Sequence, residues 1–182
     1  MSSQSNITKS DPLEADQSRW AVVALGSNLA FQGSTPSELV AAAAGRLGEL
    51  SESPVRLSSL HSTKPQGLGS GANEFCNAVA VIEPPSGLSA SDLLSELLAI
   101  ETQLGRERSK PQAGAIYASR TLDLDLIFCR NEQVNTKFLQ LPHPRASQRR
   151  FVLAPLAELW PDLCLSDELL PVSQLLEQLT HE

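Results

Sequence analysis

Short apolar runs separated by turn residues predict four β-strands in this chain. Segments 20–27 (WAVVALGS) and 76–83 (CNAVAVIE) are nearly continuous apolar runs, as expected of buried strands, and segment 55–63 (VRLSSLHST) is also typical of a strand. Segment 120–128 (RTLDLDLIF) alternates leucine with aspartate. This period of two predicts a strand with one apolar face and one polar face.

Two further segments have the apolar spacing of amphipathic helices. The first follows a start signal in which Thr35 is the N-cap, Pro36 is the first helical residue and Glu38 completes a capping box. The second begins after Ser89, with Asp92 at the third helical position. The predicted buried faces consist of Leu39, Val40, Ala43 and Leu47 in the first helix and of Leu93, Leu94, Leu97 and Ile100 in the second.

The predicted order of elements is strand, helix, strand, strand, helix, strand, and residues 147–160 and 172–180 add C-terminal helices. This order indicates an α+β fold of the ferredoxin-like βαββαβ type, in which helices pack on one face of an antiparallel sheet. Residues 1–18 are polar and lack periodicity, so we expect a flexible N-terminal tail. Residues 19–182 are predicted to form a single domain.

The composition is that of a globular chain rather than a disordered or membrane-spanning one. Of the 182 residues, 41% are hydrophobic and 19% are charged, which supplies enough apolar material for a core. No apolar run approaches the roughly 18–20 residues that cross a bilayer, so no membrane partner is expected. The absence of a signal-like stretch before Trp20 and the three widely spaced cysteines together predict a reducing, cytoplasmic location.

The charge is distributed unevenly along the sequence. The net charge is −7, but residues 106–150 contain nine basic and four acidic residues, so this segment carries +5 and the rest of the chain carries −12. Local basicity in an acidic protein indicates a discrete anion site, because a surface that coats nucleic acid would usually make the whole domain basic. A solvated charged face is the alternative interpretation.

Asp123 and Asp125 share the polar face of the predicted strand 120–128, whereas Leu122, Leu124 and Leu126 point to the other face. The Cβ atoms of the two aspartates should lie about 6.5–7 Å apart. Two like charges at that spacing repel each other unless a cation or a proton relieves them. A few hard oxygen ligands suit Mg²⁺, which keeps waters and shares its other positions with phosphates. A pair of solubilising acids on an exposed face is the alternative.

Basic residues around this pair favour the metal site. Arg120 immediately precedes the strand, and the predicted topology can bring other basic residues from loops and helix ends to the same face. Carboxylates for a metal, together with several guanidinium groups, are what a metal-bound polyphosphate requires. The other basic residues in question are Arg106, Arg108, His143 and Arg149.

Phenylalanines beside polar loops suggest an aromatic ligand as well. Phe75 and Asn77 lie at the start of the predicted strand 76–83, and Phe151 lies near the start of the first C-terminal helix. Because aromatic residues make up only 4% of the chain, these two rings are candidates for a stacking slot. Asn77 would read a heterocycle through its paired donor and acceptor. Taken singly, each phenylalanine is also explained as a core residue.

Together these motifs resemble the 6-hydroxymethyl-7,8-dihydropterin pyrophosphokinase family over roughly residues 20–165. The RTLDLDL segment and the arginine-rich PHPR…RRFVL segment are the most specific of them. The matching segments are ALGSNL (24–29), a T-x-P-x-G pattern formed by Thr63, Pro65 and Gly67, FCNAV (75–79), IETQLGRER (100–108), RTLDLDL (120–126) and PHPR…RRFVLAPL (142–156).

The resemblance implies an enzyme of folate biosynthesis that transfers pyrophosphate from ATP to the hydroxymethyl group of the pterin, with AMP as the other product. It implies that Asp123 and Asp125 bind two Mg²⁺ ions and act in catalysis with Arg106 and Arg120. Further residues implied on the ATP side are Glu101, Arg108, His143 and Arg149. Residues implied on the pterin side are Thr63, Pro65, Gln66, Phe75, Asn77, Tyr117 and Phe151.

The chain departs from the family pattern just before Arg120. Family members commonly have Trp-Gly-Pro there, whereas this chain has Tyr-Ala-Ser at residues 117–119. We hypothesise that Tyr117 replaces the tryptophan as an aromatic residue that closes over the ligands.

Two other functional classes are weighed against the enzyme. A non-catalytic ferredoxin-like module that binds a small ligand would not need an aspartate pair with convergent arginines. An RNA-binding sheet would expose aromatic residues on its central strands, whereas this sheet is expected to expose acids, which repel a phosphate backbone. We therefore expect an enzyme that acts as a monomer on ATP and a pterin alcohol and does not bind nucleic acid.

Overall fold

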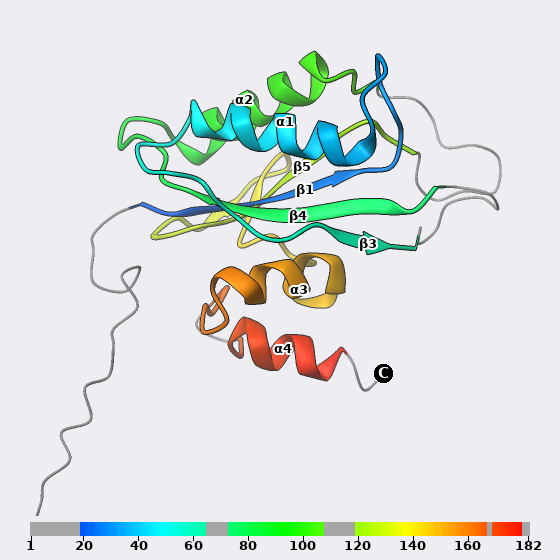
Figure 1. Cartoon of the computed structure of the whole chain (residues 1–182). Coiled ribbons are helices and arrows are strands. Elements are labelled where there is room, and N and C mark those ends of the chain that lie inside the picture. Colours follow the sequence, from blue (N-terminus) through cyan, green and yellow to red (C-terminus); the bar gives the residue numbers. More distant parts are fainter. Residues whose placement is uncertain (1–18, 65–72, 108–118, 167–168, 180–182) are drawn as a thin grey trace, which may run out of the picture.

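A central antiparallel sheet separates two layers of helices in the computed structural model (Figure 1). The structure describes residues 19–64, 73–107, 119–166 and 169–179. The predicted tail over residues 1–18 lies outside these ranges. The order of elements confirms the predicted α+β fold, with its ferredoxin-like arrangement and additional C-terminal helices.

Within the described residues the sheet has five strands, in the order β2-β4-β1-β5, and β3 pairs with the same edge of β4 as β2. The central strand β1 pairs with β4 on one side and with β5 on the other, and all seven of its residues are buried. Burial on both faces explains its continuous apolar sequence. The strands are β1 (Ala21–Ser27), β2 (Arg56–Leu57), β3 (His61–Thr63), β4 (Phe75–Ile82) and β5 (Asp123–Cys129).

Helices α1 (Pro36–Gly48) and α2 (Ala90–Gln103) cover one face of the sheet. The predicted capping box of α1 is confirmed, because the Glu38 backbone N–H donates to Thr35 Oγ1 and the Thr35 N–H donates to Glu38 Oε2 at 2.7 Å. Ser89 caps α2 as predicted. Most of the two predicted apolar faces packs against the sheet; Leu94 is only partly buried, and Leu39 is buried but lies outside this core.

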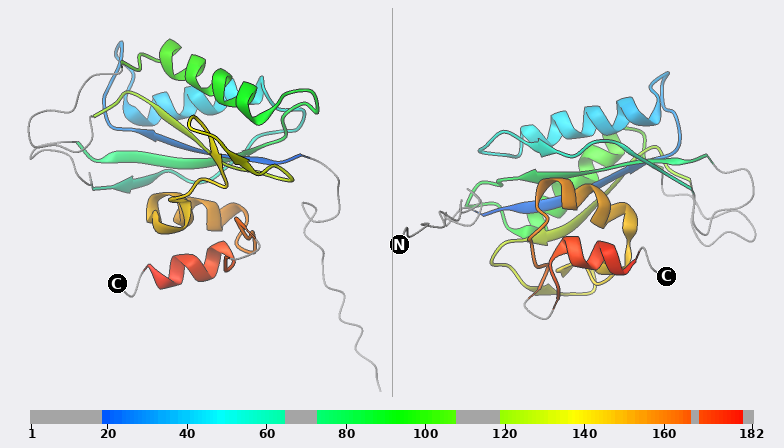
Figure 2. Two further views of the ribbon diagram at one scale, coloured as in Figure 1. Left: turned by 180° about the vertical axis from the view of Figure 1, so that it is seen from behind. Right: turned by 60° about the horizontal axis from the view of Figure 1, so that its bottom comes forward.

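The C-terminal helices α3 (Arg150–Leu159) and α4 (Val172–Gln178) lie on the opposite face of the sheet (Figure 2). A second apolar core fills the space between α3 and the sheet, and it includes Val22, Val79 and Ile127. In the described part of the chain, no helix is both long and apolar enough to cross a membrane.

One prediction of secondary structure was wrong in detail, and one element was missed. The predicted strand 55–63 divides into β2 and β3, because the Ser58 hydroxyl accepts the bond from the Val79 N–H at 3.0 Å and so interrupts the regular ladder. A short hairpin of β6 (Val134–Asn135) and β7 (Gln140–Leu141) was not predicted. Each of its strands has two residues, which is too short to show a period.

Candidate functional site

The two aspartates of the leucine–aspartate strand lie on the face of the sheet that α3 covers only in part. Asp123 and Asp125 belong to β5, the strand at one edge of the sheet, and their side chains remain 26% and 37% exposed. Leu124 and Leu126 point into the core under α1 and α2. The predicted separation of polar and apolar faces is therefore confirmed.

Three arginines from separate parts of the chain bind these carboxylates. Arg106, which follows α2, donates from Nη1 to Asp123 Oδ1 at 2.9 Å, and Arg120 donates to Asp123 Oδ2. Arg149, the residue before α3, donates from Nη1 to Asp125 Oδ2 at 3.0 Å. Residues that are distant in sequence thus form the predicted cluster of two acids and several guanidinium groups.

Arg106 makes a backbone hydrogen bond in addition to its ion pair with Asp123. Its Nη1 also donates to the Leu122 carbonyl oxygen at 2.6 Å, and its side chain is only 15% exposed. Its Nε is buried and has no hydrogen-bond partner among the described residues. This guanidinium is therefore fixed in place but retains an unsatisfied donor, which costs free energy in a buried position.

The predicted phenylalanines lie next to these arginines. The guanidinium carbon of Arg120 is 5.9 Å from the centroid of the Phe75 ring, and that of Arg149 is 5.4 Å from the centroid of the Phe151 ring. Both distances are within the range of cation–π attraction. Each half-buried ring therefore borders a guanidinium that binds a carboxylate of β5.

Asn77 and Thr63 form a fixed polar pair beside Phe75. The Asn77 side chain is 5% exposed, and its Nδ2 donates to Thr63 Oγ1 at 2.8 Å. The two residues come from the paired strands β4 and β3, in which Thr63 lies opposite Phe75. The amide oxygen of Asn77 is therefore held in one orientation, as a residue that reads a ligand must be.

His143 lies at the Asp125 end of the site. Burial lowers the pKa of its imidazole, and the positive charges of Arg149 and Arg145 lower it further, whereas the charge of Asp125 raises it. The net effect favours the neutral form of the ring. Its Nδ1 accepts a hydrogen bond from the Arg145 backbone N–H at 3.2 Å, which places the ring proton on Nε2.

The structure gives Glu101 a position that the sequence did not indicate. This residue of α2 is 3% exposed, and its carboxylate accepts a hydrogen bond from the Leu124 backbone N–H at 2.8 Å. Leu124 lies between the two aspartates in β5. Glu101 therefore fixes the backbone that presents the aspartates, from the helix at the edge of the strand.

Asn28 is a site residue that the sequence analysis missed. It is fully buried, and its Oδ1 accepts from the Arg120 backbone N–H at 2.8 Å, while its Nδ2 donates to Ser119 Oγ at 3.1 Å and to the Asn73 carbonyl at 3.4 Å. Its position directly after a buried strand is a sequence signal for this role, because such residues often bond to nearby backbone, and Asn28 also lies in the ALGSNL segment that resembles the family.

Four predicted site residues lie outside the described residues. They are Pro65, Gln66, Arg108 and Tyr117. The hypothesis that Tyr117 closes over the ligands therefore stays a prediction.

The donor chemistry of the site suits an oxygen-rich anion with a bound cation. In the described ranges, no group of three or more histidine, cysteine, aspartate or glutamate side chains forms a complete metal cage. The two carboxylates instead fill only part of a metal's coordination shell, so a bound ligand can supply the other positions. The three guanidinium groups can bind the anionic oxygens of that ligand. The phenylalanines add apolar surface for a flat ring.

Comparisons with known proteins give a consistent family. Residues 22–161 match the protein family described as 7,8-dihydro-6-hydroxymethylpterin-pyrophosphokinase. The 2-amino-4-hydroxy-6-hydroxymethyldihydropteridine pyrophosphokinase of Haemophilus influenzae is 37% identical over 163 residues, which are 89% of this chain and 91% of the relative. The protein of the same name from Pseudomonas aeruginosa is 38% identical over 146 residues, 80% of this chain and 83% of the relative.

A solved structure resembles the fold. The crystal structure of Plasmodium falciparum HPPK-DHPS superimposes with a TM-score of 0.63 and 14% sequence identity, and the match covers 91% of this chain and 46% of that one. This chain therefore spans less than half of the solved chain, and the likeness supports the fold alone.

Proposed function

The chain belongs to the 7,8-dihydro-6-hydroxymethylpterin-pyrophosphokinase family, and from this premise we propose how its residues transfer pyrophosphate. The enzyme is an ATP-dependent diphosphotransferase of folate biosynthesis that acts on the hydroxymethyl group of the pterin. A non-catalytic binding module is not favoured. The proposal also has the chain acting as a monomer in the cytoplasm.

One observation carries the assignment of residues: three guanidinium groups from separate elements converge on two carboxylates of one strand. Surface ion pairs contribute little to stability, so an arrangement with three partly buried arginines is better explained by a polyanionic ligand. ATP provides that ligand, and the phenylalanines next to Arg120 and Arg149 provide a place for the pterin ring.

Mg²⁺ fits the two carboxylates. Both are hard oxygen donors on one face of β5, and both are partly exposed. Mg²⁺ commonly binds through one or two carboxylates and completes its shell with waters and phosphate oxygens. We therefore place two Mg²⁺ ions at Asp123 and Asp125, where they would neutralise phosphate charge and lower the pKa of a bound alcohol.

The side chains of this enzyme would then orient the two substrates. Arg106, Arg120 and Arg149 would exchange their carboxylate partners for phosphate oxygens, and the unsatisfied Nε of Arg106 would gain an acceptor. His143 would donate its Nε2 proton to a phosphate oxygen. Phe75 and Phe151 would hold the pterin ring between them.

In the reaction, the hydroxymethyl oxygen of the pterin forms a bond to the β-phosphorus of ATP. The bond between that phosphorus and the oxygen that bridges it to the α-phosphorus breaks, and AMP leaves with this oxygen while the hydroxyl proton is released. No covalent intermediate with the protein is needed, because positioning and charge neutralisation supply most of the acceleration in phosphoryl transfer.

Removing either carboxylate tests the proposal. We expect Asp123→Ala and Asp125→Ala to lower turnover by at least about a thousandfold, equivalent to about 4 kcal/mol, while the fold is retained. AMP and pterin diphosphate are measured with ATP, Mg²⁺ and the pterin alcohol, and circular dichroism checks the fold. Mg²⁺-dependent AMP formation at the wild-type rate in either folded variant would contradict these roles.

A further inference from the structure

The loop between β1 and α1 contacts the chain beside two of the site arginines. At one end of this loop, the Asn28 side chain accepts from the Arg120 backbone N–H at 2.8 Å, and the Asn28 N–H donates to the Arg120 carbonyl oxygen at 3.1 Å. Further along the loop, the Phe31 ring lies against Gly105, the residue before Arg106. Figure 1 shows this loop beside the end of α2. One loop therefore supports both arginines that share a carboxylate of β5.

Gly105 ends α2 in a left-handed conformation that glycine adopts easily. Its φ is 83°, and its N–H donates to the Thr102 carbonyl oxygen at 3.1 Å. The Arg106 N–H donates to the Glu101 carbonyl oxygen at 2.9 Å. These two bonds form a Schellman motif, which satisfies the last carbonyl groups of a helix. The backbone of Arg106 is therefore joined to the end of α2, and its direction depends on the turn at Gly105.

The ring of Phe31 covers this turn. A Cβ added to Gly105 would lie 2.4 Å from both Cδ2 and Cε2 of Phe31 and 2.5 Å from its Cγ. Nearly equal distances to three adjacent ring atoms arise only for a point over the face of the ring, so the flat side of the ring lies on Gly105. A side chain at residue 105 would therefore displace the ring or the turn.

A tight turn holds Phe31 in its place. The Phe31 N–H donates to the Ser34 carbonyl oxygen at 3.1 Å, and the Ser34 N–H donates to the Phe31 carbonyl oxygen at 2.9 Å. Gln32 and Gly33 between them both have positive φ, as in the type I′ turns of hairpins. In the described part of the chain, the half-buried Phe31 packs with neither apolar core. Its ring is therefore fixed beside α2 without belonging to the main packing of the fold.

We infer that Phe31 is a positioning residue for pyrophosphate transfer, because its ring holds the turn at Gly105 and with it the Arg106 guanidinium. This inference rests on the proposed function, in which Arg106 exchanges its carboxylate partner for phosphate oxygens. During that exchange the guanidinium keeps its bond to the Leu122 carbonyl oxygen but loses its bond to Asp123, so its direction depends more on its own backbone. A misplacement of about 1 Å can lower the rate of such a reaction about a hundredfold.

Phe31→Ala is the test. We expect kcat to fall about 10- to 100-fold while the KM for the pterin alcohol changes less than about twofold, because the ring acts through a group on the phosphate side. Phe31→Tyr keeps the flat ring and should retain most of the wild-type kcat. Ser34→Ala is the matched control in the same turn, since backbone groups that alanine retains bond Ser34 to Phe31, and it should behave as the wild type. Urea unfolding checks that each variant is folded.

A double-mutant cycle shows whether the effect passes through Arg106. Once Arg106→Ala has removed the guanidinium, Phe31→Ala should change the single-turnover rate by less than about twofold. The same loss in both backgrounds would overturn the inference, because Phe31 would then act on the fold or on another group. If Phe31→Ala does not fold, the cycle is measured with Phe31→Leu, which keeps an apolar side chain without the flat ring. Its loss of rate should be smaller and should also vanish in the Arg106→Ala background.

The outcomes also separate this inference from the proposed function. A wild-type chain that forms no AMP and no pterin diphosphate would refute the function itself. An active wild type, together with a folded Phe31→Ala variant that keeps the wild-type kcat, would refute only the role of Phe31.

Discussion

At the scale of single residues, the site consists of oppositely charged side chains that pair with one another before any ligand binds. Asp123 pairs with Arg106 and Arg120, and Asp125 pairs with Arg149. Two carboxylates on one strand face would otherwise repel each other. The arginines offset this repulsion in the folded chain, and the same groups are suited to bind phosphates.

Asn28 positions one of these arginines. Asn28→Ala removes the acceptor for the Arg120 N–H and the donors to Ser119 and Asn73, and we expect it to lower stability by about 1–3 kcal/mol and to raise the KM for ATP. Urea unfolding and steady-state kinetics measure the two effects. Ser119→Ala is the control, since it removes only the bond at 3.1 Å. Equal effects of both variants on the KM for ATP would argue against the positioning role.

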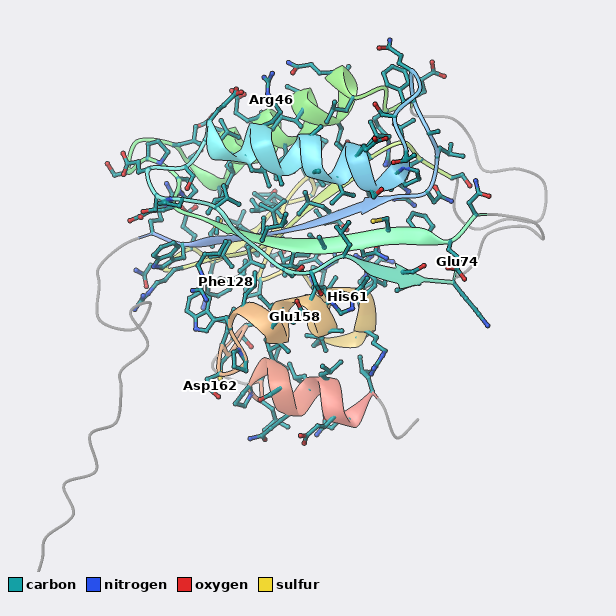
Figure 3. The ribbon with its side chains drawn as sticks, viewed as in Figure 1. Arg46, His61, Glu74, Phe128, Glu158 and Asp162 are labelled. Atoms are coloured by element: carbon teal, nitrogen blue, oxygen red, sulfur yellow. The ribbon has the colours of Figure 1, made fainter. Side chains whose placement is uncertain are left out.

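At the scale of elements, side-chain hydrogen bonds connect the segment containing β2 and β3 to α3. His61 and Glu158 point toward each other between β3 and α3 (Figure 3), with Nε2 and Oε1 2.6 Å apart. Glu158 also accepts from the Ser59 backbone N–H at 2.9 Å and from the Ser59 hydroxyl at 2.8 Å. Ser59 and Glu158 both approach Nε2 of His61, so the three residues do not form a catalytic relay, in which the acid must bind the other ring nitrogen.

The hydrogen bonds of Glu158 with Ser59 and His61 predict a pH-dependent contribution to stability. The hydrogen bonds from the Ser59 backbone and side chain lower the pKa of Glu158, with a smaller effect of His61. A carboxyl whose pKa is lower in the folded state stabilises the fold above its unfolded pKa, about 4.3, and loses this contribution as the pH falls through the folded pKa.

Glu158→Gln should therefore be less stable than the wild type near neutral pH, and the difference should shrink as the pH falls from about 5 to about 3. Urea midpoints over this range measure the effect, which should be small because the Glu158 side chain is 38% exposed. Glu96→Gln on α2 is the control, since no hydrogen bond or ion pair of Glu96 is described. A difference that grows toward low pH would contradict the assigned direction of the pKa.

At the scale of the whole molecule, two apolar cores share one sheet. Alternate residues of β1 and β4 enter the core under α1 and α2 or the core under α3 and α4. Neither layer of helices can lose its packing without exposing one face of these strands. The two layers should therefore unfold as one cooperative unit.

Coincident unfolding tests this expectation. Trp20 and Trp160 both belong to the core on the α3 side, so tryptophan fluorescence reports that layer, whereas far-ultraviolet circular dichroism reports all helices and strands. We expect superimposable urea transitions. Leu97→Ala and Leu153→Ala, one in each core, should each cost about 2–5 kcal/mol and keep a single transition. Loss of the fluorescence signal before the dichroism signal would show that the α3 layer unfolds separately.

Much of the fold follows from interactions between near neighbours in the sequence. The alternation of leucine and aspartate sets which side chains of β5 face the helices, and the Thr35–Glu38 capping box sets the start of α1. The short hairpin at residues 134–141 could not be predicted in this way, because strands of two residues carry no periodicity and depend on packing. The interruption at Ser58 depends on a bond to Val79, 21 residues further along the chain.

The sequence by itself determined the residue types of the site and the face on which the aspartates lie, because a strand alternates its side chains whatever surrounds it. Only the tertiary structure decided that Arg149 binds Asp125 and that Arg106 shares Asp123 with Arg120. It alone placed Glu101 behind the strand, Asn28 behind Arg120, and the Phe31 ring against Gly105. These contacts join segments that are far apart along the chain, and they form only when packing brings the strands and helices together.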